Sequence, residues 1–253
     1  MAHPTIAMQM FTLRNECELD YAATLKKVAA IGYRAVQVSP LHKYTARFIK
    51  KAMDDLGLGS AGTHAGLDLL EKDFSAAVAK ANDLGTDWLA LASIPAERRK
   101  TAEDWRTMGK VMTDLGARLK AEGINFAYHN HSFEFEKFGG RCGYDIMYEA
   151  ADGTLVHNEI DTYWVAHGGQ DPVAYLRRFA GHLQLTHFKD MASGPDRRMA
   201  PVGEGVLDWP NIIKACQDGG ALWLCIEQDE CAPLAPLEAA RKSFENCRRW
   251  GLV

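Results

Sequence analysis

The sequence predicts a single (β/α)8 barrel of parallel strands that extends over residues 1–253. Eight short apolar runs alternate with eight longer amphipathic runs, the order expected when helices connect the strands of a parallel sheet. The length of 253 residues is close to the roughly 250 that such a barrel needs. No linker or low-complexity tract divides the chain, so we expect one domain. An open, doubly wound sheet is the alternative.

The predicted strands are short and mostly apolar. In order along the chain they are Ile6–Met10, Ala35–Val38, Gly59–Thr63, Trp88–Ala92, Asn125–His129, Leu155–Ile160, Leu183–Phe188 and Leu222–Glu227. The runs between them have the helical spacing of apolar residues. These predicted helices are Tyr21–Ile31, Thr45–Leu56, Phe74–Leu84, Ala102–Ala121, Tyr144–Ala151, Pro172–Phe179, Pro210–Asp218 and Pro236–Trp250. Several of them end at a glycine just before the next strand, as at Gly32, Gly57 and Gly123. Glycine tolerates the left-handed turn that closes a helix, so these positions support the division.

The composition is that of a globular protein, with 47% hydrophobic and 25% charged residues. A formal net charge of -4 gives no electrostatic reason to expect a nucleic-acid partner. The six cysteines are scattered without CxxC spacing, which favours reduced thiols over a disulfide framework. No stretch approaches the roughly 20 apolar residues of a membrane span, and no charged-then-apolar leader opens the chain. We therefore expect a cytoplasmic protein.

Ionisable residues lie at the C-terminal ends of four consecutive predicted strands. Functional groups of such barrels come from these strand ends and the loops after them. Because strand residues alternate between faces, the last polar member of each inward-facing set should converge at the barrel mouth. These sets are Ala127, His129 and His131; Glu159 and Asp161; Leu185, His187 and Lys189; and Trp223, Cys225 and Glu227.

A single histidine at a strand end is usually an exposed loop residue or a satisfied core group. Four such ends in consecutive strands are harder to explain that way, because each ionisable group facing a barrel interior needs a partner. A shared cation would satisfy all of them, and Asp, His and Glu together suit a divalent metal. The sequence therefore predicts a metal site.

The chain resembles the sugar isomerase/epimerase superfamily, whose members have a xylose-isomerase-like TIM barrel. The resemblance spans essentially the whole chain. It is carried by His129-Asn130-His131-x-x-Glu134-Phe135, Asp161-Thr162-Tyr163-Trp164, His187-Phe188-Lys189-Asp190, Val202-Gly203-Glu204-Gly205-x-x-Asp208-Trp209 and Ile226-Glu227-Gln228-Asp229. Tagatose and psicose epimerases, inosose isomerases and dehydratases and hydroxypyruvate isomerases belong to this superfamily.

The resemblance implies a divalent metal, usually Mn²⁺ but also Zn²⁺, Co²⁺ or Mg²⁺, with Asp161, His187 and Glu227 among its ligands. Such a metal binds adjacent hydroxyl and carbonyl oxygens of a sugar and stabilises the enediolate formed by proton loss. The epimerases have a glutamate at the end of the fifth strand, where this sequence has His129. We expect Glu134 as the fourth ligand because it preserves the charge of the family's site. Strand parity favours His129 instead.

The substitution at His129 also bears on the reaction. Epimerisation commonly needs two bases on opposite substrate faces, and the usual glutamate pair is altered here. The His-Asn-His and His-x-Lys-Asp motifs look closer to the inosose dehydratases, in which a base removes a proton next to a ketone. His129, His131 and Lys189 are candidate acid/base groups, together with Glu227. An ion pair of Lys189 with Asp190 or Glu204 is the alternative explanation for that lysine.

Other polar and aromatic residues near strand ends are candidates for substrate binding, with ordinary loop chemistry or packing as the alternative for each. They are Gln9, Gln37, His64, Trp164, Arg197 and Arg198. The two arginines precede the loop that reaches over the substrate in the superfamily, so a phosphorylated substrate is compatible. No GxGxxG or P-loop motif indicates a nucleotide.

These observations predict a metal-dependent isomerase, epimerase or lyase that acts on a sugar, keto-sugar or inositol derivative, with a homo-oligomer possible. Two alternatives use the same barrel. An endonuclease IV-like phosphodiesterase needs more metal ligands and basic loops, and a non-catalytic sugar-binding barrel needs neither a base nor an acid. The sequence does not identify the substrate, because fold alone does not set function.

Overall fold

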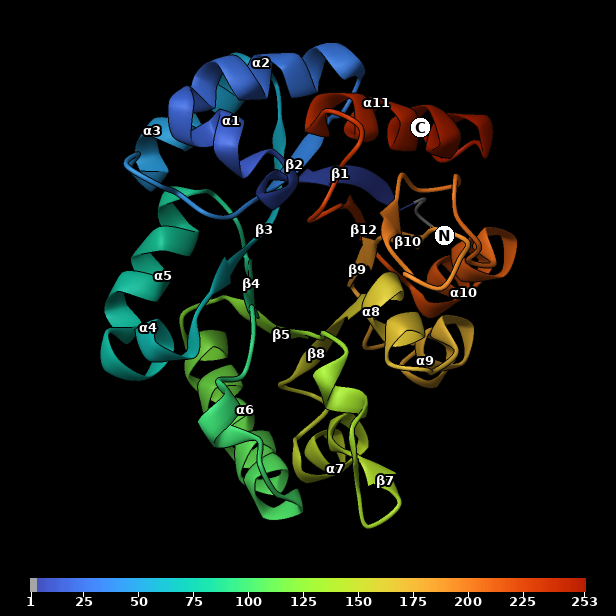
Figure 1. The fold of residues 1–253 in the computed structure, drawn as a ribbon. Coiled ribbons are helices and arrows are strands. Elements are labelled where there is room, and N and C mark those ends of the chain that lie inside the picture. Colours follow the sequence, from blue (N-terminus) through green and yellow to red (C-terminus); the bar gives the residue numbers. More distant parts are fainter. Residues whose placement is uncertain (1–3) are drawn as a thin grey trace.

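A closed barrel of eight parallel strands forms the centre of the protein in a computed structural model, which describes residues 4–253 (Figure 1). The first three residues of the predicted 1–253 unit lie outside the described part. The strand order β1-β12-β9-β8-β5-β4-β3-β2 follows the chain around the barrel and closes it between β1 and β12. The barrel strands are β1 (Thr5–Gln9), β2 (Ala35–Val38), β3 (Gly59–Ala65), β4 (Trp88–Leu91), β5 (Asn125–His129), β8 (His157–Asp161), β9 (Leu185–Phe188) and β12 (Trp223–Ile226). The predicted fold class is confirmed, and the open sheet is excluded.

Helices surround the barrel on its outside (Figure 1). They are α1 (Arg14–Leu19), α2 (Tyr21–Ile31), α3 (Ala46–Asp55), α4 (Leu67–Lys72), α5 (Phe74–Asp83), α6 (Ala102–Ala121), α7 (Gly143–Ala150), α8 (Thr162–His167), α9 (Pro172–Arg178), α10 (Trp209–Gly219) and α11 (Pro236–Arg249). Short polar side chains cap several N-termini. Thr101 and Asp104 form a reciprocal capping box on α6, the longest of these helices. Within residues 4–253, none of the helices combines the length and the apolarity needed to cross a bilayer.

The segments after the strands contain small elements that the sequence did not predict. Three are 3-10 turns, η1 (Met10–Leu13), η2 (Ala96–Arg98) and η3 (Phe133–Phe135). Two are antiparallel pairs, β6 (Lys137–Phe138) with β7 (Arg141–Cys142) and β10 (Asp190–Met191) with β11 (Met199–Ala200). The short helices α1, α4 and α8 were also not predicted. They are too short to show the repeated spacing of apolar residues that identifies a helix in a sequence.

The lower part of the barrel interior is apolar. Small residues and two tryptophans fill it, namely Ala7, Ala35, Ala61, Cys225 and Trp223 on one side and Trp88, Ala90, Ala127 and Leu185 on the other. Strand residues two positions further on face the same interior, so the next layer toward the C-terminal ends contains Gln9, Gln37, His129, Glu159 and His187. This second layer is polar, and its side chains contact one another and not water.

One irregularity brings a histidine into this polar layer. The register between β2 and β3 advances two residues from Val36 to Val38 but three from Ser60 to Thr63, so β3 carries a bulge. Gly62 lies in this bulge with φ of 116°, and a Cβ there would come within 3.3 Å of the Trp88 backbone oxygen. Strict alternation from Ala61 would turn Thr63 inward. The extra residue turns His64 inward instead, and the Thr63 hydroxyl donates to the Val38 carbonyl at 2.7 Å.

Candidate metal centre and active site

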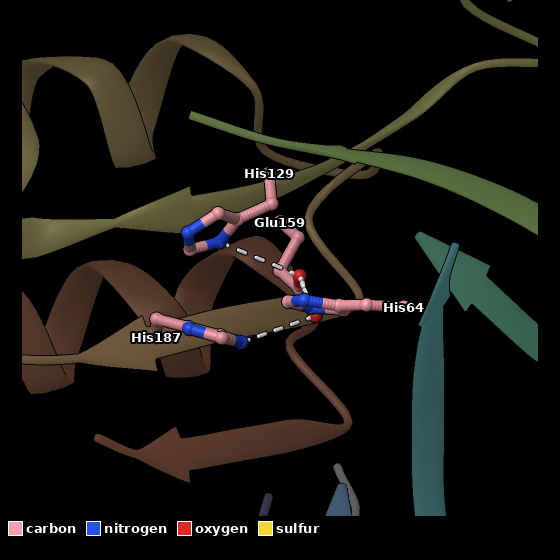
Figure 2. Close-up of side chains that lie close together, drawn as sticks. All are labelled: His64, His129, Glu159 and His187. Atoms are coloured by element: carbon pink, nitrogen blue, oxygen red, sulfur yellow. Dashed lines mark hydrogen bonds and ion pairs between the residues drawn. The ribbon is translucent and has the colours of Figure 1, made fainter. Parts of the chain in front are cut away.

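Glu159 lies at the centre of a buried group of imidazoles inside the barrel (Figure 2). Its Oε2 is 2.6 Å from His64 Nε2 and 3.5 Å from His129 Nδ1, and its Oε1 is 3.4 Å from His187 Nε2. These four side chains come from β3, β5, β8 and β9. We call them the deep group. Their ligand atoms all lie within 4.8 Å of one another, which is compatible with a shared metal ion.

A second group overlaps the first and lies toward the barrel mouth. His129, Asp161, His187 and Glu227 also offer ligand atoms within 4.8 Å of one another, and we call them the upper group. His187 Nδ1 is 2.8 Å from Glu227 Oε2, and His129 Nε2 is 4.0 Å from Asp161 Oδ2. His129 and His187 therefore belong to both groups, with one ring nitrogen directed toward each.

Lys189 adds a cation to the upper group. Its ammonium lies 3.3 Å from Asp161 Oδ2, 3.1 Å from Glu227 Oε2 and 2.7 Å from Asp229 Oδ2. The side chain is only 1% exposed. Asp161 is fixed in addition by its role at the start of α8, where its Oδ1 accepts from Trp164 N at 2.9 Å. Lys189 therefore pairs with three carboxylates, not with Asp190 or Glu204.

The electrostatics divide the carboxylates into two kinds. Burial alone would raise the pKa of Glu159, but the neighbouring His187 and His64 outweigh burial and hold that pKa well below its usual range. Glu227 has a lowered pKa in the same way, because Lys189 and His187 oppose its burial. Burial raises the pKa of Asp161 to about 7 in spite of Lys189. Burial likewise raises the pKa of Asp229, and Glu227 adds to that effect.

The histidines are divided as well. Burial lowers the pKa of His131 to about 4, and the Lys189 charge acts in the same direction. The pKa of His129 is also lowered, by burial and by His187. Burial opposes the charge of His187, but Glu159 and Glu227 raise its pKa to about 10. His131 is therefore a neutral imidazole at pH 7.

A pocket of about 220 Å³ opens onto both groups. Its lining contains the ionisable residues His64, His129, His131, Lys189, Glu227 and Asp229, together with Phe11, Ser39, Ala92 and Ser93. Four of these residues, His129, His131, Lys189 and Glu227, were predicted from the sequence as acid/base groups. The pocket therefore places ligand groups, a neutral base and a cation around one small volume.

The structure does not bring Glu134 to either group. Glu134 is fully buried in η3, where its carboxylate accepts from the Tyr128 hydroxyl at 2.5 Å and from His131 N at 2.9 Å. Tyr128 is on the outward face of β5, so Glu134 packs behind the strand and not at the barrel mouth. His129 takes the position in the upper group that we expected for Glu134, as strand parity favoured.

The predicted substrate-binding residues are distributed unevenly. His64 joins the deep group, whereas Gln9 is fully buried and donates to Gln37. Trp164 lies beside the site, with its ring centroid 5.4 Å from Lys189 Nζ.

Neither arginine lines the pocket that holds the two groups. Arg197 donates to the carbonyl oxygens of Ala166 and His167 and so holds the end of α8. Arg198 borders a neighbouring hollow with Trp164, and its side chain is 72% exposed.

Several residues of the site, His64 among them, were not predicted as metal ligands or acid/base groups. Glu159 was noted only as sharing a face with Asp161, Gln37 only as a weak candidate for the pocket, and Asp229 only as part of a motif. Gln37 donates to Glu159, and its Oε1 lies 2.7 Å from His187 Nε2. Spacing by two residues along β8 was the available signal for Glu159.

The residues present fit a divalent metal. His129 Nδ1 is a buried atom without a hydrogen-bond partner, and Asp161 Oδ2 has only its ion pair with Lys189 at 3.3 Å; both residues belong to the ligand groups. Buried polar atoms without partners are costly, so a bound cation would satisfy what the protein leaves open. Imidazole and carboxylate together are common ligands of Zn²⁺ and related ions.

The fold and this site define a parallel eight-stranded barrel with a candidate metal centre at the C-terminal ends of its strands. The model of the xylose isomerase-like TIM barrel family matches residues 25–250, so the chain belongs to that family. The chain is 20% identical over 264 aligned residues to an inosose dehydratase of Clostridium beijerinckii, covering 89% of this chain and 88% of that protein.

Solved structures share the fold. A sugar phosphate isomerase/epimerase from Parabacteroides distasonis superposes with a TM-score of 0.85 at 22% identity, covering 99% of each chain. The IOLI protein, whose crystal structure has a bound zinc atom, superposes with a TM-score of 0.73 at 14% identity over 97% of each chain.

Proposed function

We propose that the protein is a divalent-metal-dependent enzyme that removes a proton next to a carbonyl group of a sugar, keto-sugar or inositol derivative. The observation that carries this proposal is the pocket itself, in which a neutral histidine and a buried lysine face the same small volume as the ligand groups. Family membership and the similarity to an inosose dehydratase support the substrate class.

A bound Mn²⁺, Zn²⁺ or Co²⁺ would be held by side chains of the two groups and would supply Lewis-acid stabilisation of the developing oxyanion. Mg²⁺ suits the site less well, because both groups contain at least two imidazoles and Mg²⁺ prefers oxygen ligands.

His131 is the best-suited general base. Its lowered pKa of about 4 keeps the ring neutral throughout the physiological range. Its Nδ1 is buried and has no hydrogen-bond partner, so the ring can accept a proton. Phe133 stacks on the ring with centroids 5.4 Å apart and planes inclined by 9°, which holds its orientation. His129 is held between the two groups and is less free to act.

Lys189 is the best-suited acid. Three carboxylates keep its pKa above the usual lysine value, so the ammonium stays charged at neutral pH. It can donate a hydrogen bond to an oxygen that gains negative charge, or a proton to a departing hydroxyl. Glu227 contacts both Lys189 and His187, and its lowered pKa keeps it an anion that orients them.

One neutral base and one charged acid favour a dehydratase over an epimerase. In an elimination, His131 would take the proton from the carbon next to the carbonyl, and the hydroxyl on the following carbon would leave as water with a proton from Lys189. A two-base epimerisation would require a second neutral base on the opposite face of the substrate. An endonuclease-like activity has less support, because the net charge is negative and neither predicted arginine lines the pocket.

A substrate panel tests this proposal. The metal-loaded protein is incubated in D₂O with inososes and keto-sugars, with and without phosphate groups, and NMR records solvent-deuterium incorporation and loss of water. We expect exchange at the carbon next to the carbonyl for at least one compound, and a loss of about 10²–10⁴-fold in His131→Gln, the usual contribution of a general base. Lys72→Met, which removes only an exposed i,i+4 pair with Asp68, should retain full activity. Exchange that is equally fast in His131→Gln would contradict the assignment of the base, and absence of exchange across the panel would contradict the function.

A further inference from the structure

We propose that the metal is bound one layer deeper than the carboxylates at the barrel mouth, by His64, His129, Glu159 and His187. In this arrangement Asp161, Glu227 and Asp229 do not hold the metal but serve Lys189 as its counter-ions. The inference rests on the proposed function only in requiring that a divalent metal binds. The class of ion is Zn²⁺, Co²⁺ or Mn²⁺, because three imidazoles and one carboxylate suit these ions.

The position of Lys189 is the first argument. Its ammonium is 3.3 Å from Asp161 Oδ2 and 3.1 Å from Glu227 Oε2, so a cation already lies against two of the four side chains of the upper group. Asp229 holds it there at 2.7 Å. A divalent ion at the same carboxylates would face a positive charge at close range without intervening solvent, because Lys189 is buried. Like charges so placed repel strongly.

The spacing of the deep group is the second argument. A tetrahedral ion with bonds of 2.0–2.1 Å has neighbouring ligand atoms roughly 3.3 Å apart. Glu159 Oε1 lies 3.4 Å from His187 Nε2, and Glu159 Oε2 lies 3.5 Å from His129 Nδ1. Neither distance is a normal hydrogen bond, and His129 Nδ1 has no hydrogen-bond partner. His64 Nε2 is a hydrogen-bond partner of Glu159 Oε2 at 2.6 Å, so metal binding would have to replace that hydrogen bond and move the two atoms apart. In the upper group the corresponding His129–Asp161 separation is 4.0 Å.

The contacts behind the histidines are the third argument. A histidine that binds a metal usually donates its other ring N–H to a carboxylate or carbonyl. His187 Nε2 lies 2.7 Å from Gln37 Oε1, a hydrogen bond that metal binding would replace. If His187 binds the metal through Nε2, its Nδ1 donates to Glu227 at 2.8 Å. If His129 binds through Nδ1, its Nε2 is directed toward Asp161. Glu227 and Asp161 then support the metal through the histidines and remain available to Lys189. Gln37 also donates a hydrogen bond to Glu159.

Access for a substrate is the fourth argument. His64 and His129 line the pocket, whereas Glu159 and His187 are fully buried and do not line it. A substrate oxygen entering the pocket would therefore reach the metal from the side of His64 and His129. Lys189 and His131 line the same pocket above this position. The bulge at Gly62 serves this arrangement, because it turns His64 inward.

Metal binding to variant proteins tests this inference without any assay of activity. Metal-depleted protein is titrated with Zn²⁺ by calorimetry, and X-ray absorption at the zinc edge counts the imidazole ligands. We expect three imidazoles in the wild-type protein. His64→Gln and Glu159→Gln should weaken binding by more than 100-fold. Asp161→Asn and Glu227→Gln should weaken it by about 10–100-fold at most, the usual effect of a partner behind a ligand.

The controls separate the possible failures. His157→Gln removes a histidine that belongs to neither group and should bind Zn²⁺ like the wild-type protein. Circular dichroism checks that each variant is folded. His64→Gln keeps the test valid if the fully buried Glu159→Gln does not fold. Two imidazoles in the wild-type site, or loss of binding in Asp161→Asn and Glu227→Gln with unchanged binding in His64→Gln, would overturn the deep site but leave the proposed function intact. No Zn²⁺, Co²⁺ or Mn²⁺ binding by the wild-type protein would remove the proposed function itself.

Discussion

Replacing Lys189 with methionine tests whether the buried lysine is the counter-ion of the three carboxylates. Methionine keeps most of the volume of the side chain and removes its charge. Asp161 and Glu227 are at most 5% exposed, so loss of the ammonium leaves them as uncompensated buried charges. Breaking a buried ion pair by removing one partner costs about 3–5 kcal/mol. We therefore expect Lys189→Met to lower the free energy of unfolding by that amount in metal-depleted protein at pH 8.

The difference in stability between wild-type protein and Lys189→Met depends on pH because both the lysine and its carboxylate partners titrate. The pKa of Lys189 is raised in the folded protein. The stabilisation that the protonated lysine contributes is therefore complete below the unfolded pKa of about 10.4 and is lost only above it. The carboxylates limit the stabilisation at low pH, since a protonated carboxyl no longer needs a cation. The difference between wild-type and variant protein should thus be largest from about pH 8 to 10, and it should shrink below pH 7, where Asp161, with a pKa of about 7, becomes protonated.

Urea denaturation of both proteins across this range measures the effect. In thermal unfolding, a loss of about 3–5 kcal/mol corresponds to a decrease in Tm of about 6–20 °C for a protein of this size. Lys214→Met is the matched control, because Lys214 forms an exposed i,i+4 pair with Asp218 at 2.8 Å. That variant should change stability by no more than about 0.5 kcal/mol. Equal stabilities of wild-type protein and Lys189→Met at pH 8 would refute the counter-ion role.

Two further predictions concern the regions that support the site. Burial raises the pKa of Glu134 to about 7, so between pH 4.5 and 7 the folded protein keeps a proton on this carboxyl that the unfolded chain releases. The stability that this proton contributes is complete below pH 4.5 and is lost as the pH rises through 7. The free energy of unfolding of the wild-type protein relative to Glu134→Gln, measured in urea, should therefore fall by about 3 kcal/mol from pH 4.5 to 8, and a constant difference would argue against a raised pKa. Gly109→Ala should destabilise the protein by about 1–3 kcal/mol, because the new Cβ would lie 2.3 Å from the Met147 carbonyl oxygen and force α6 away from α7. Gly153→Ala, whose Cβ would meet nothing within 4 Å, is its control and should stay within about 0.5 kcal/mol; similar losses in both variants would show that packing between α6 and α7 is not the cause.

The regular part of the fold was predictable because it depends on local pattern. Each predicted strand overlaps a barrel strand, and no predicted strand end differs from the observed one by more than two residues. Alternation along the strands also placed His129, Asp161, His187 and Glu227 on the interior face, where the structure has them. The short helices α1, α4 and α8 were missed because a helix of one or two turns has no repeated apolar stripe.

The supporting contacts of the site were less predictable. Glu134 was expected at the metal because its charge matched the family's ligand set, but Tyr128 and the backbone of His131 hold it behind β5. Arg197 was expected at the substrate, but the carbonyl oxygens at the end of α8 take its guanidinium. The partners of Glu134 are a hydroxyl and a backbone amide within six residues of it, and those of Arg197 are backbone carbonyl oxygens 30 and 31 residues away. A rule for the spacing of metal ligands or substrate contacts identifies neither kind of partner.

The sequence by itself determined the barrel, the strand ends that carry ionisable groups and the chemistry of a divalent metal, because these follow from hydrophobic period, strand parity and residue type. Only the tertiary structure decided how those groups are paired. The bulge at Gly62 brings His64 to Glu159, and the pairing of β9 with β8 on one side and β12 on the other brings Lys189 between Asp161 and Glu227. Both depend on distances between strands that are remote in the chain, and no local pattern in the sequence encodes those distances.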